Sequence, residues 1–248
     1  AVLLDFHGLK GSQNGSPTSG NCGGCQMPNT SHCGNTTYNW LDNKETNLAV
    51  IESLSKRYGD NPMLFGFGVA NHVFSGDGND IMAFYQEAYN IIRKYNKDVF
   101  VFLDQLYDPS TYPFHNEMNV GEDRHYFVRS RPSKRKKIIQ NITKDVGKVR
   151  RWNVLVGEWA LSGAYGHDLW RSAFRRHYDE LKVFAKAQLE TYEKHAMGWV
   201  YWSYKTNHHG VFDYRYLCEQ GLLPGCQEDH TFGSVDWWSS SNLNGTAE

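Results

Sequence analysis

The feature that most constrains this chain's fold is a regular alternation of short apolar runs with helix-like segments. Six runs have the length and composition of strands, at residues 2–6, 64–70, 99–104, 124–128, 153–160 and 198–205. Between several of them lie segments with helical apolar spacing, at residues 47–59, 80–96 and 169–195. We expect Asp80 to be the N-cap of the second helix. Strands that alternate with helices predict βα units built on a parallel sheet.

The number of these units restricts the architecture further. A closed (β/α)8 barrel needs eight parallel strands, whereas the sequence shows six. An open arc of six strands would expose two edges and half of its core. The pattern therefore predicts either a barrel completed by residues outside this chain or a different fold.

Composition bounds the class of protein. The chain has 248 residues, of which 40% are hydrophobic, so it can bury one sizeable core as a single domain over residues 1–248. The formal net charge of −1 gives no indication of binding to nucleic acid or to an anionic membrane surface. No apolar run reaches 18 residues, so no transmembrane span is expected. No signal peptide is visible before the opening AVLLDF.

Sequons and cysteines predict a secreted or cell-surface glycoprotein with disulfides. The sequons lie at Asn14, Asn29, Asn35, Asn141 and Asn244. Cys218 and Cys226 could close a small loop, and Cys22, Cys25 and Cys33 cluster beside His32. The cluster also resembles part of a zinc site, but the interleaved sequons favour a disulfide there. Because there are five cysteines, one is free or pairs outside the chain.

Polar residues gather where the predicted strands end, which is where barrels of parallel strands place their active sites. The set comprises Asp5, His7, Asn71, His72, Asp104, Gln105, His125, Tyr126, Glu158 and Trp202. Any one of them could be an ordinary loop anchor. Glu158 is less ordinary, because a carboxylate that follows a strongly apolar strand is costly to bury without a function.

Several of these segments resemble family 5 glycoside hydrolases, specifically the fungal exo-β-1,3-glucanases. The run VLLDFHGLKGSQNG at residues 2–15 resembles their third-strand motif, with a specific His-Gly-x-x-Gly-Ser-Gln-Asn-Gly match. The run VGEWA at 156–160 resembles their nucleophile strand, and GWVYWSYKT at 198–206 resembles their eighth strand. GLLP at 221–224 also fits the family's tail.

The resemblance implies an α/β fold, a (β/α)8 TIM barrel of which this chain covers about strands 3–8. It also implies a retaining double displacement on β-glucan by two carboxyl groups about 5 Å apart, without cofactor or metal. Glu158 matches the nucleophile, and Trp202 matches the aromatic platform under the sugar. The expected substrate-binding residues are His7, Asn71, His125, Tyr126 and Trp202.

The chain departs from the family at several of these positions together. The family's acid/base glutamate is His72 here, and the proline after it is Val73. The tyrosine that orients the nucleophile falls on Phe127. A histidine, with a reference pKa of about 6.5, could donate a proton, but imidazole differs in shape from a glutamate side chain.

We therefore predict a secreted glucan 1,3-β-glucosidase-like pseudoenzyme that binds β-glucan or a related glycan, or serves as a structural module. The alternative is an active retaining hydrolase with Glu158 as nucleophile and His72 as substitute acid/base. A third possibility is a scaffold that binds only protein. The missing strands predict a second polypeptide or an upstream segment that completes the barrel.

Overall fold

A computed structural model describes residues 1–15, 19, 39–74, 76–104, 117, 119–127, 137, 140–141, 144, 153–161, 178–207 and 209–225. The predictions for Cys22, Cys25, Cys33, Cys226 and the sequons at Asn29, Asn35 and Asn244 lie outside these residues. The chain divides into two compact units. The first unit comprises Ala1–Arg124 and Arg151–Leu155, and the second comprises His125–Arg150 and Val156–Glu248.

The described strands form one sheet in the order β1-β2-β3-β4-β5-β6, which is also their order along the chain. Their bounds are Val2–Asp5, Leu64–Gly68, Phe100–Asp104, Val120–Phe127, Asn153–Ala160 and Gly198–Tyr201. The pairs β1–β2, β2–β3 and β3–β4 are parallel. The predicted parallel sheet of βα units is therefore confirmed.

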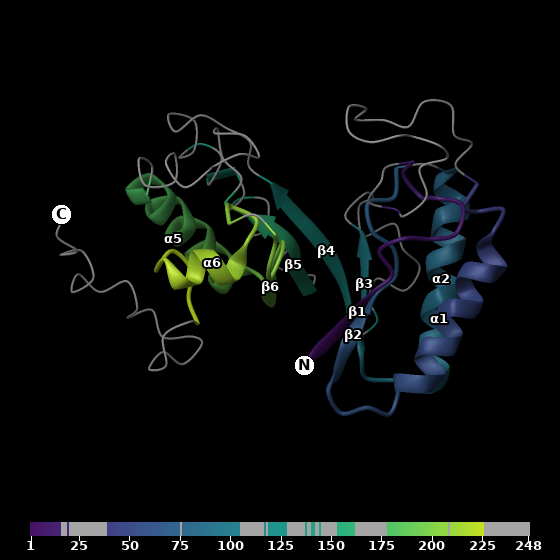
Figure 1. The fold of residues 1–248 in the computed structure, drawn as a ribbon. Coiled ribbons are helices and arrows are strands. Elements are labelled where there is room, and N and C mark those ends of the chain that lie inside the picture. The colour runs from purple at the N-terminus through teal and green to yellow at the C-terminus, as the bar shows by residue number, and fades with distance from the viewer. Residues whose placement is uncertain are drawn as a thin grey trace. The chain divides into compact units, whose positions relative to one another are not determined.

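Two helices and three strands build the core of the first unit. Helix α1 (Lys44–Tyr58) and helix α2 (Gly78–Tyr95) lie side by side against β1–β3 (Figure 1). Their apolar stripes bury Ile51 and Phe84, while β2 contributes Phe67. Trp40 packs edge-on against Phe84, with ring centroids 5.1 Å apart. This packing holds the ends of β1, β2 and β3 in place.

Helix α2 begins earlier than the sequence predicts. Its N-cap is Asp77, whose side chain accepts a hydrogen bond from Asn79 N at 2.8 Å, and Asp80 lies in the first turn. The expectation that Asp80 is the cap was wrong. Both are acidic residues near a helix N-terminus, where a carboxylate is favourable, so sequence alone does not separate them.

Strand β4 is also longer than predicted, because it begins at Val120 rather than at Arg124. The four added residues include the acidic Glu122 and Asp123, and a buried ion pair stabilises the first of these: Arg124 Nη2 donates to Glu122 Oε2 at 3.0 Å. Asn153 Nδ2 on β5 donates to Val120 O at 2.9 Å. Paired charges thus stabilise a part of the strand that lacks the apolar pattern by which strands are usually recognised in a sequence.

In the second unit, helix α5 (Tyr178–His195) packs its aromatic face against β5 and β6. The centre of this packing is Trp159, which is fully buried and contacts Tyr192, Trp199 and Tyr201 edge-on at 4.8–5.5 Å between ring centroids. The short helix α6 (Tyr214–Glu219) follows, capped by Asp213. No helix among the described residues has the length and apolarity needed to cross a membrane.

Candidate functional site

In the first unit, the polar residues at the ends of β1 and β2 form one hydrogen-bonded group. His7 Nδ1 lies 2.8 Å from Asp5 Oδ2, and Asn71 Nδ2 lies 2.8 Å from His7 Nδ1 and 3.0 Å from His7 Nε2. The imidazole donates to the carboxylate in the tautomer that carries its proton on Nδ1, and Nε2 is then the nitrogen that can accept from the amide. The structure therefore brings together two of the predicted substrate-binding residues, His7 and Asn71.

Gln13 holds this hydrogen-bonded group in place. Its side chain is fully buried and donates through Nε2 to His7 O at 2.8 Å and to Asn71 O at 2.7 Å. Its Oε1 accepts from Leu9 N at 3.0 Å. Sequence reasoning did not assign a role to Gln13, although the residue lies within the Gly-Ser-Gln-Asn-Gly motif. One amide side chain thus ties the loop after β1 to the loop after β2.

His72 has an unusual backbone. Its φ angle is +47°, in the left-handed region that L-residues rarely adopt, although histidine is among the residues enriched there. Its N–H donates to Asp104 Oδ2 at 2.7 Å, and Asp104 is the buried last residue of β3. Its ring stacks on Phe74 with centroids 5.7 Å apart. Local strain of this kind persists where surrounding contacts hold it, and it is frequent at functional positions.

In the second unit, Glu158 is brought next to His125. Glu158 lies near the end of β5 and is only 7% exposed, and its Oε2 is 3.6 Å from Nδ1 of His125 on β4. This separation is longer than a hydrogen bond but within reach of an ion pair when the imidazole is protonated. A buried carboxylate with a histidine beside it can act as a nucleophile that is oriented by a neighbour.

The residues after His125 separate onto the two faces of β4. Tyr126 stacks on Tyr192 of α5, with ring centroids 5.9 Å apart, so it faces the helix layer. Phe127 approaches Phe212 at 6.4 Å. Because successive side chains of a strand alternate, Phe127 shares the face of His125, and Tyr126 does not. The alternation was readable in the sequence, and it favours a packing role for Tyr126.

Trp202 directly follows β6, and its backbone N–H donates to Trp159 O at 2.9 Å. Its side chain is 40% exposed, which leaves a large indole surface open to solvent. Since Tyr201 faces Trp159, the alternation directs Trp202 to the opposite face. An exposed indole of this kind is suited to pack against the apolar face of a sugar ring.

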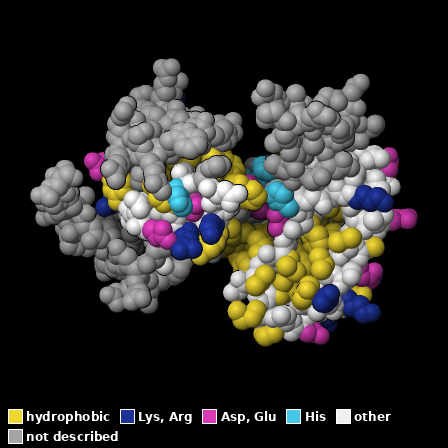
Figure 2. Space-filling model, in the orientation of Figure 1, with side chains coloured by type: hydrophobic (Ala, Val, Ile, Leu, Met, Phe, Trp, Pro, Cys, Tyr) yellow, Lys and Arg dark blue, Asp and Glu magenta, His cyan; other side chains and the backbone are white. Residues whose placement is uncertain are grey.

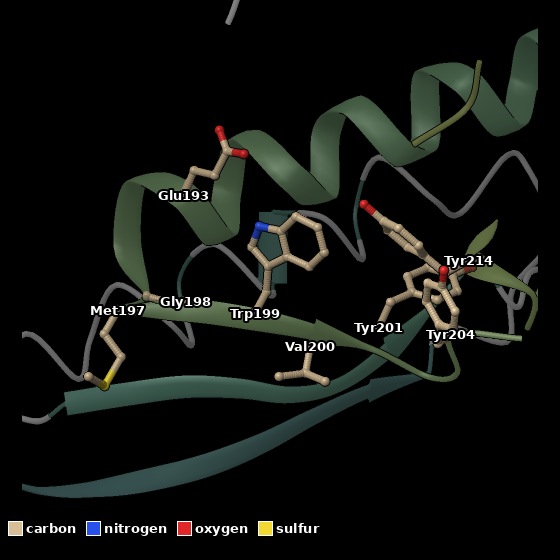
Figure 3. Close-up of a pocket in the computed structure, with 9 residues that line it drawn as sticks. Glu193, Met197, Gly198, Trp199, Val200, Tyr201, Tyr204 and Tyr214 are labelled. Carbon is tan, nitrogen blue, oxygen red and sulfur yellow. The ribbon is translucent and has the colours of Figure 1, made fainter. Parts of the chain in front are cut away.

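A cavity of about 810 Å³ lies elsewhere in the second unit, along β6 (Figure 3). Its lining includes Glu193, Trp199, Tyr204 and Tyr214, and none of the predicted site residues. Burial raises the pKa of the Tyr214 hydroxyl above its ordinary value, and burial beside Glu190 raises the pKa of the Glu193 carboxyl.

Comparison with known proteins agrees with the sequence motifs. The chain is 24% identical to a glucan 1,3-β-glucosidase of Yarrowia lipolytica over 276 residues, covering 92% of this chain and 62% of that protein. It is 25% identical to glucan 1,3-β-glucosidase 3 of Schizosaccharomyces pombe, covering 90% of this chain and 47% of the relative. The chain's curated homologues are glucan 1,3-β-glucosidases. The predicted family resemblance is confirmed, and the chain spans about half to three fifths of these relatives. No family model matches.

Solved structures show the fold. Endo-glycoceramidase II from Rhodococcus sp. aligns with a TM-score of 0.57 and 15% identity, over 84% of this chain and 57% of that one. Thermotoga maritima Cel5A in complex with cellobiose aligns with a TM-score of 0.53 and 18% identity, over 73% and 67%. The predicted fold class is confirmed: the six strands are part of a (β/α)8 barrel.

Proposed function

We propose that this protein is a glucan 1,3-β-glucosidase-like protein that retains a glycan-binding site and the nucleophile, Glu158, but has an impaired acid/base at His72. The observation that carries the proposal is the buried Glu158 carboxylate beside His125. Keeping a carboxylate buried costs free energy, so its retention after an apolar strand supports a role in the site. His7, Asn71, His125 and Trp202 are the proposed substrate-binding residues. Tyr126, also predicted to bind substrate, is kept as a weaker candidate because its side chain faces the helix layer.

The chemistry explains the expected impairment. In a retaining mechanism the nucleophile's carboxylate attacks the anomeric carbon while an acid protonates the departing glycosidic oxygen, and the same group later activates water. Replacement of that acid costs about 10²–10⁴ in rate. A histidine at position 72 offers one proton, but from an imidazole nitrogen that must reach the glycosidic oxygen at hydrogen-bond distance.

The test compares two substrates on the full chain. We expect background hydrolysis of laminarin, but measurable cleavage of 2,4-dinitrophenyl β-glucoside, whose leaving group needs no proton. Mass spectrometry should then show one hexosyl group attached to Glu158, because the second step lacks its base. Glu158→Gln should abolish this labelling, whereas the matched change Glu190→Gln on α5 should not affect it.

Two outcomes would contradict the proposal in different ways. Efficient laminarin hydrolysis that is lost in His72→Ala but kept in the control His195→Ala would establish the alternative, an active hydrolase with His72 as acid/base. No labelling and no laminarin binding would instead favour a protein-binding scaffold. We expect His72→Glu to restore little activity, because Val73 and Phe127 also differ from the family pattern.

We also propose an extracellular location, with disulfides and N-linked glycans. Cys218 takes part in a disulfide, and its partner lies outside the described residues. This supports an oxidising compartment. Mass spectrometry of protein from its natural source should show a Cys218–Cys226 bridge, a second bridge within Cys22, Cys25 and Cys33, and glycan on Asn29 or Asn35. Reduced Cys218 and unmodified asparagines throughout would refute this part.

The proposal finally includes a partner, either a second polypeptide or an upstream segment, that completes the barrel. Strands β1 and β6 are the first and last strands of the sheet. Hydrophobic side chains also cover much of the viewed face of the first unit (Figure 2). Its exposed large hydrophobic residues include Val2, Val50, Met63 and Phe74. Parallel sheets are normally covered on both faces, and exposed apolar area of this kind is typical of interaction surfaces.

A further inference from the structure

Phe74 differs from the other large hydrophobic residues that the first unit exposes. It is 66% exposed, and its backbone N–H donates to Gln13 O at 3.1 Å, so it lies beside the loop that follows β1. Val2 and Met63 are also exposed, but Val2 N donates to Met63 O where β1 and β2 begin. Because β1 and β2 are parallel, these two residues lie at the opposite end of the strands from Phe74. Phe74 is therefore at the strand ends where barrel folds bind their substrates.

One residue holds both the Phe74 backbone and the neighbouring polar groups. The backbone carbonyl of Gln13 accepts the bond from Phe74 N, while the Gln13 side chain donates to His7 O at 2.8 Å and to Asn71 O at 2.7 Å. Gln13 is fully buried, so water does not compete for these bonds. The Phe74 ring and the proposed sugar-binding residues His7 and Asn71 are thus carried by the same two connected loops.

His72 supports the Phe74 ring. The two rings stack with centroids 5.7 Å apart and an angle of 29° between their planes. The His72 backbone is held in turn, because its N–H donates to Asp104 Oδ2 at 2.7 Å. Val73, between the two rings in the sequence, is fully buried. In the described segment that follows β2, residues 69–74, only Phe74 therefore presents a large apolar side chain to solvent.

We propose that Phe74 is an additional sugar-binding residue, on whose exposed ring one pyranose of the glycan packs, and that His72 is the positioning residue that holds this ring. The inference rests on the proposed function and gives position 72 a role in binding. A pyranose has an apolar C–H face and a polar edge, which suit an aromatic ring with fixed polar groups nearby. A protein partner favours a contiguous apolar surface, which residues 69–74 do not offer.

Calorimetric titration of the full chain with laminarin oligosaccharides tests the platform. Phe74→Ala should weaken binding by about tenfold, as expected for the loss of one aromatic contact, whereas Phe74→Trp should keep the affinity within about twofold. Met63→Ala is the matched control, because Met63 is 57% exposed at the other end of the strands, and its affinity should also stay within about twofold. Unchanged binding in Phe74→Ala, or an equal loss in Met63→Ala, would overturn the assignment.

Nuclear Overhauser effects give a direct signature of the contact. With the phenylalanine rings isotopically labelled, we expect effects between sugar C–H protons and one phenylalanine ring, and their disappearance in Phe74→Leu identifies that ring. Effects that all persist in Phe74→Leu would overturn the proposal, because the sugar would then contact other rings.

His72→Asn tests the positioning role. Asparagine is also enriched in the left-handed backbone region but has no aromatic ring, so the change removes the support of Phe74 while the backbone is favoured as before. Binding should weaken by about threefold, the signals between sugar and Phe74 should decrease, and Tm should change little. Unchanged affinity and unchanged signals in His72→Asn would overturn the role of His72.

The outcomes separate this inference from the proposed function. If the wild-type chain binds laminarin oligosaccharides and Trp202→Ala weakens this binding while Phe74→Ala does not, the inference fails and the proposed function stands. The Phe74 ring would then belong with Val2 and Met63 to a surface for a protein partner. Absence of binding in the wild-type chain would overturn both. No readout depends on hydrolysis, so failure here leaves the role of Glu158 untouched.

Discussion

Replacing Gln13 by leucine should destabilise the protein and disorganise the strand ends that carry His7 and Asn71. The buried amide makes three hydrogen bonds, one from Leu9 N and one each to His7 O and Asn71 O. A net contribution of about 1 kcal/mol for each bond gives a loss of about 3 kcal/mol, and the backbone groups left buried without partners act in the same direction.

Urea unfolding of the full chain measures this loss, and binding of laminarin oligosaccharides measures its effect on the site. Gln86→Leu is the matched control, because Gln86 on α2 makes an exposed hydrogen bond to Asn90, and its loss should cost less than about 0.5 kcal/mol. A loss below about 1 kcal/mol for Gln13→Leu, or unchanged glycan binding despite a large loss, would refute the reasoning that Gln13 positions His7 and Asn71.

Three further predictions concern single side chains. Trp159→Ala should reduce the free energy of unfolding in urea by about 3–5 kcal/mol, since the ring is fully buried among aromatic neighbours. Trp202→Ala should weaken glycan binding and change the free energy of unfolding by less than about 1 kcal/mol. A larger loss of stability in Trp202→Ala than in Trp159→Ala would contradict the faces assigned to the two side chains. Glu193→Gln should raise Tm at pH 7, because folding raises the pKa of this carboxyl and its ionisation therefore destabilises the folded state. The gain in Tm should vanish below about pH 4, where the carboxyl is protonated in both the folded and the unfolded state. A gain in Tm that persists in acid would contradict this cause. Gly66→Ala should lower Tm, because a Cβ there would lie 2.6 Å from Phe100 O, and an unchanged Tm would show that β2 and β3 can separate without cost.

The sequence predicts the sheet well because its strands are apolar and regularly spaced. It fails on the first four residues of β4, where Glu122 forms an ion pair with Arg124 that no hydrophobic pattern reveals. Helix α6 was also not predicted. It is only six residues long and depends on contacts such as the bond from Tyr214 Oη to Pro224 O, which follow from the folded chain.

For the candidate site, the sequence indicates which residues lie at strand ends, but not which of them meet. The contact between His125 and Glu158 joins residues on neighbouring strands, and Gln13 bonds to a residue 58 positions away. The first contact depends on how β4 and β5 pair and the second on loop conformation, and periodicity along the sequence specifies neither. Tyr126 is a different case: its side chain lies on the other face of β4 from that of His125, and the alternation of side chains along a strand is sufficient to predict this.

That alternation in β4 limits how the tyrosine expected from the family resemblance could be engineered into this chain. Tyr126 lies one residue before Phe127, yet its hydroxyl cannot substitute, since a one-residue slip of the strand would turn the Glu122 and Arg124 side chains to the other face. The burial of this pair on one face of the sheet, together with the hydrogen bond from Asn153 Nδ2 to Val120 O, therefore favours the observed register of β4. A hydroxyl on the face of β4 that carries His125 must therefore be introduced at position 127 itself, beside Phe212, because the side chain of Tyr126 lies on the other face.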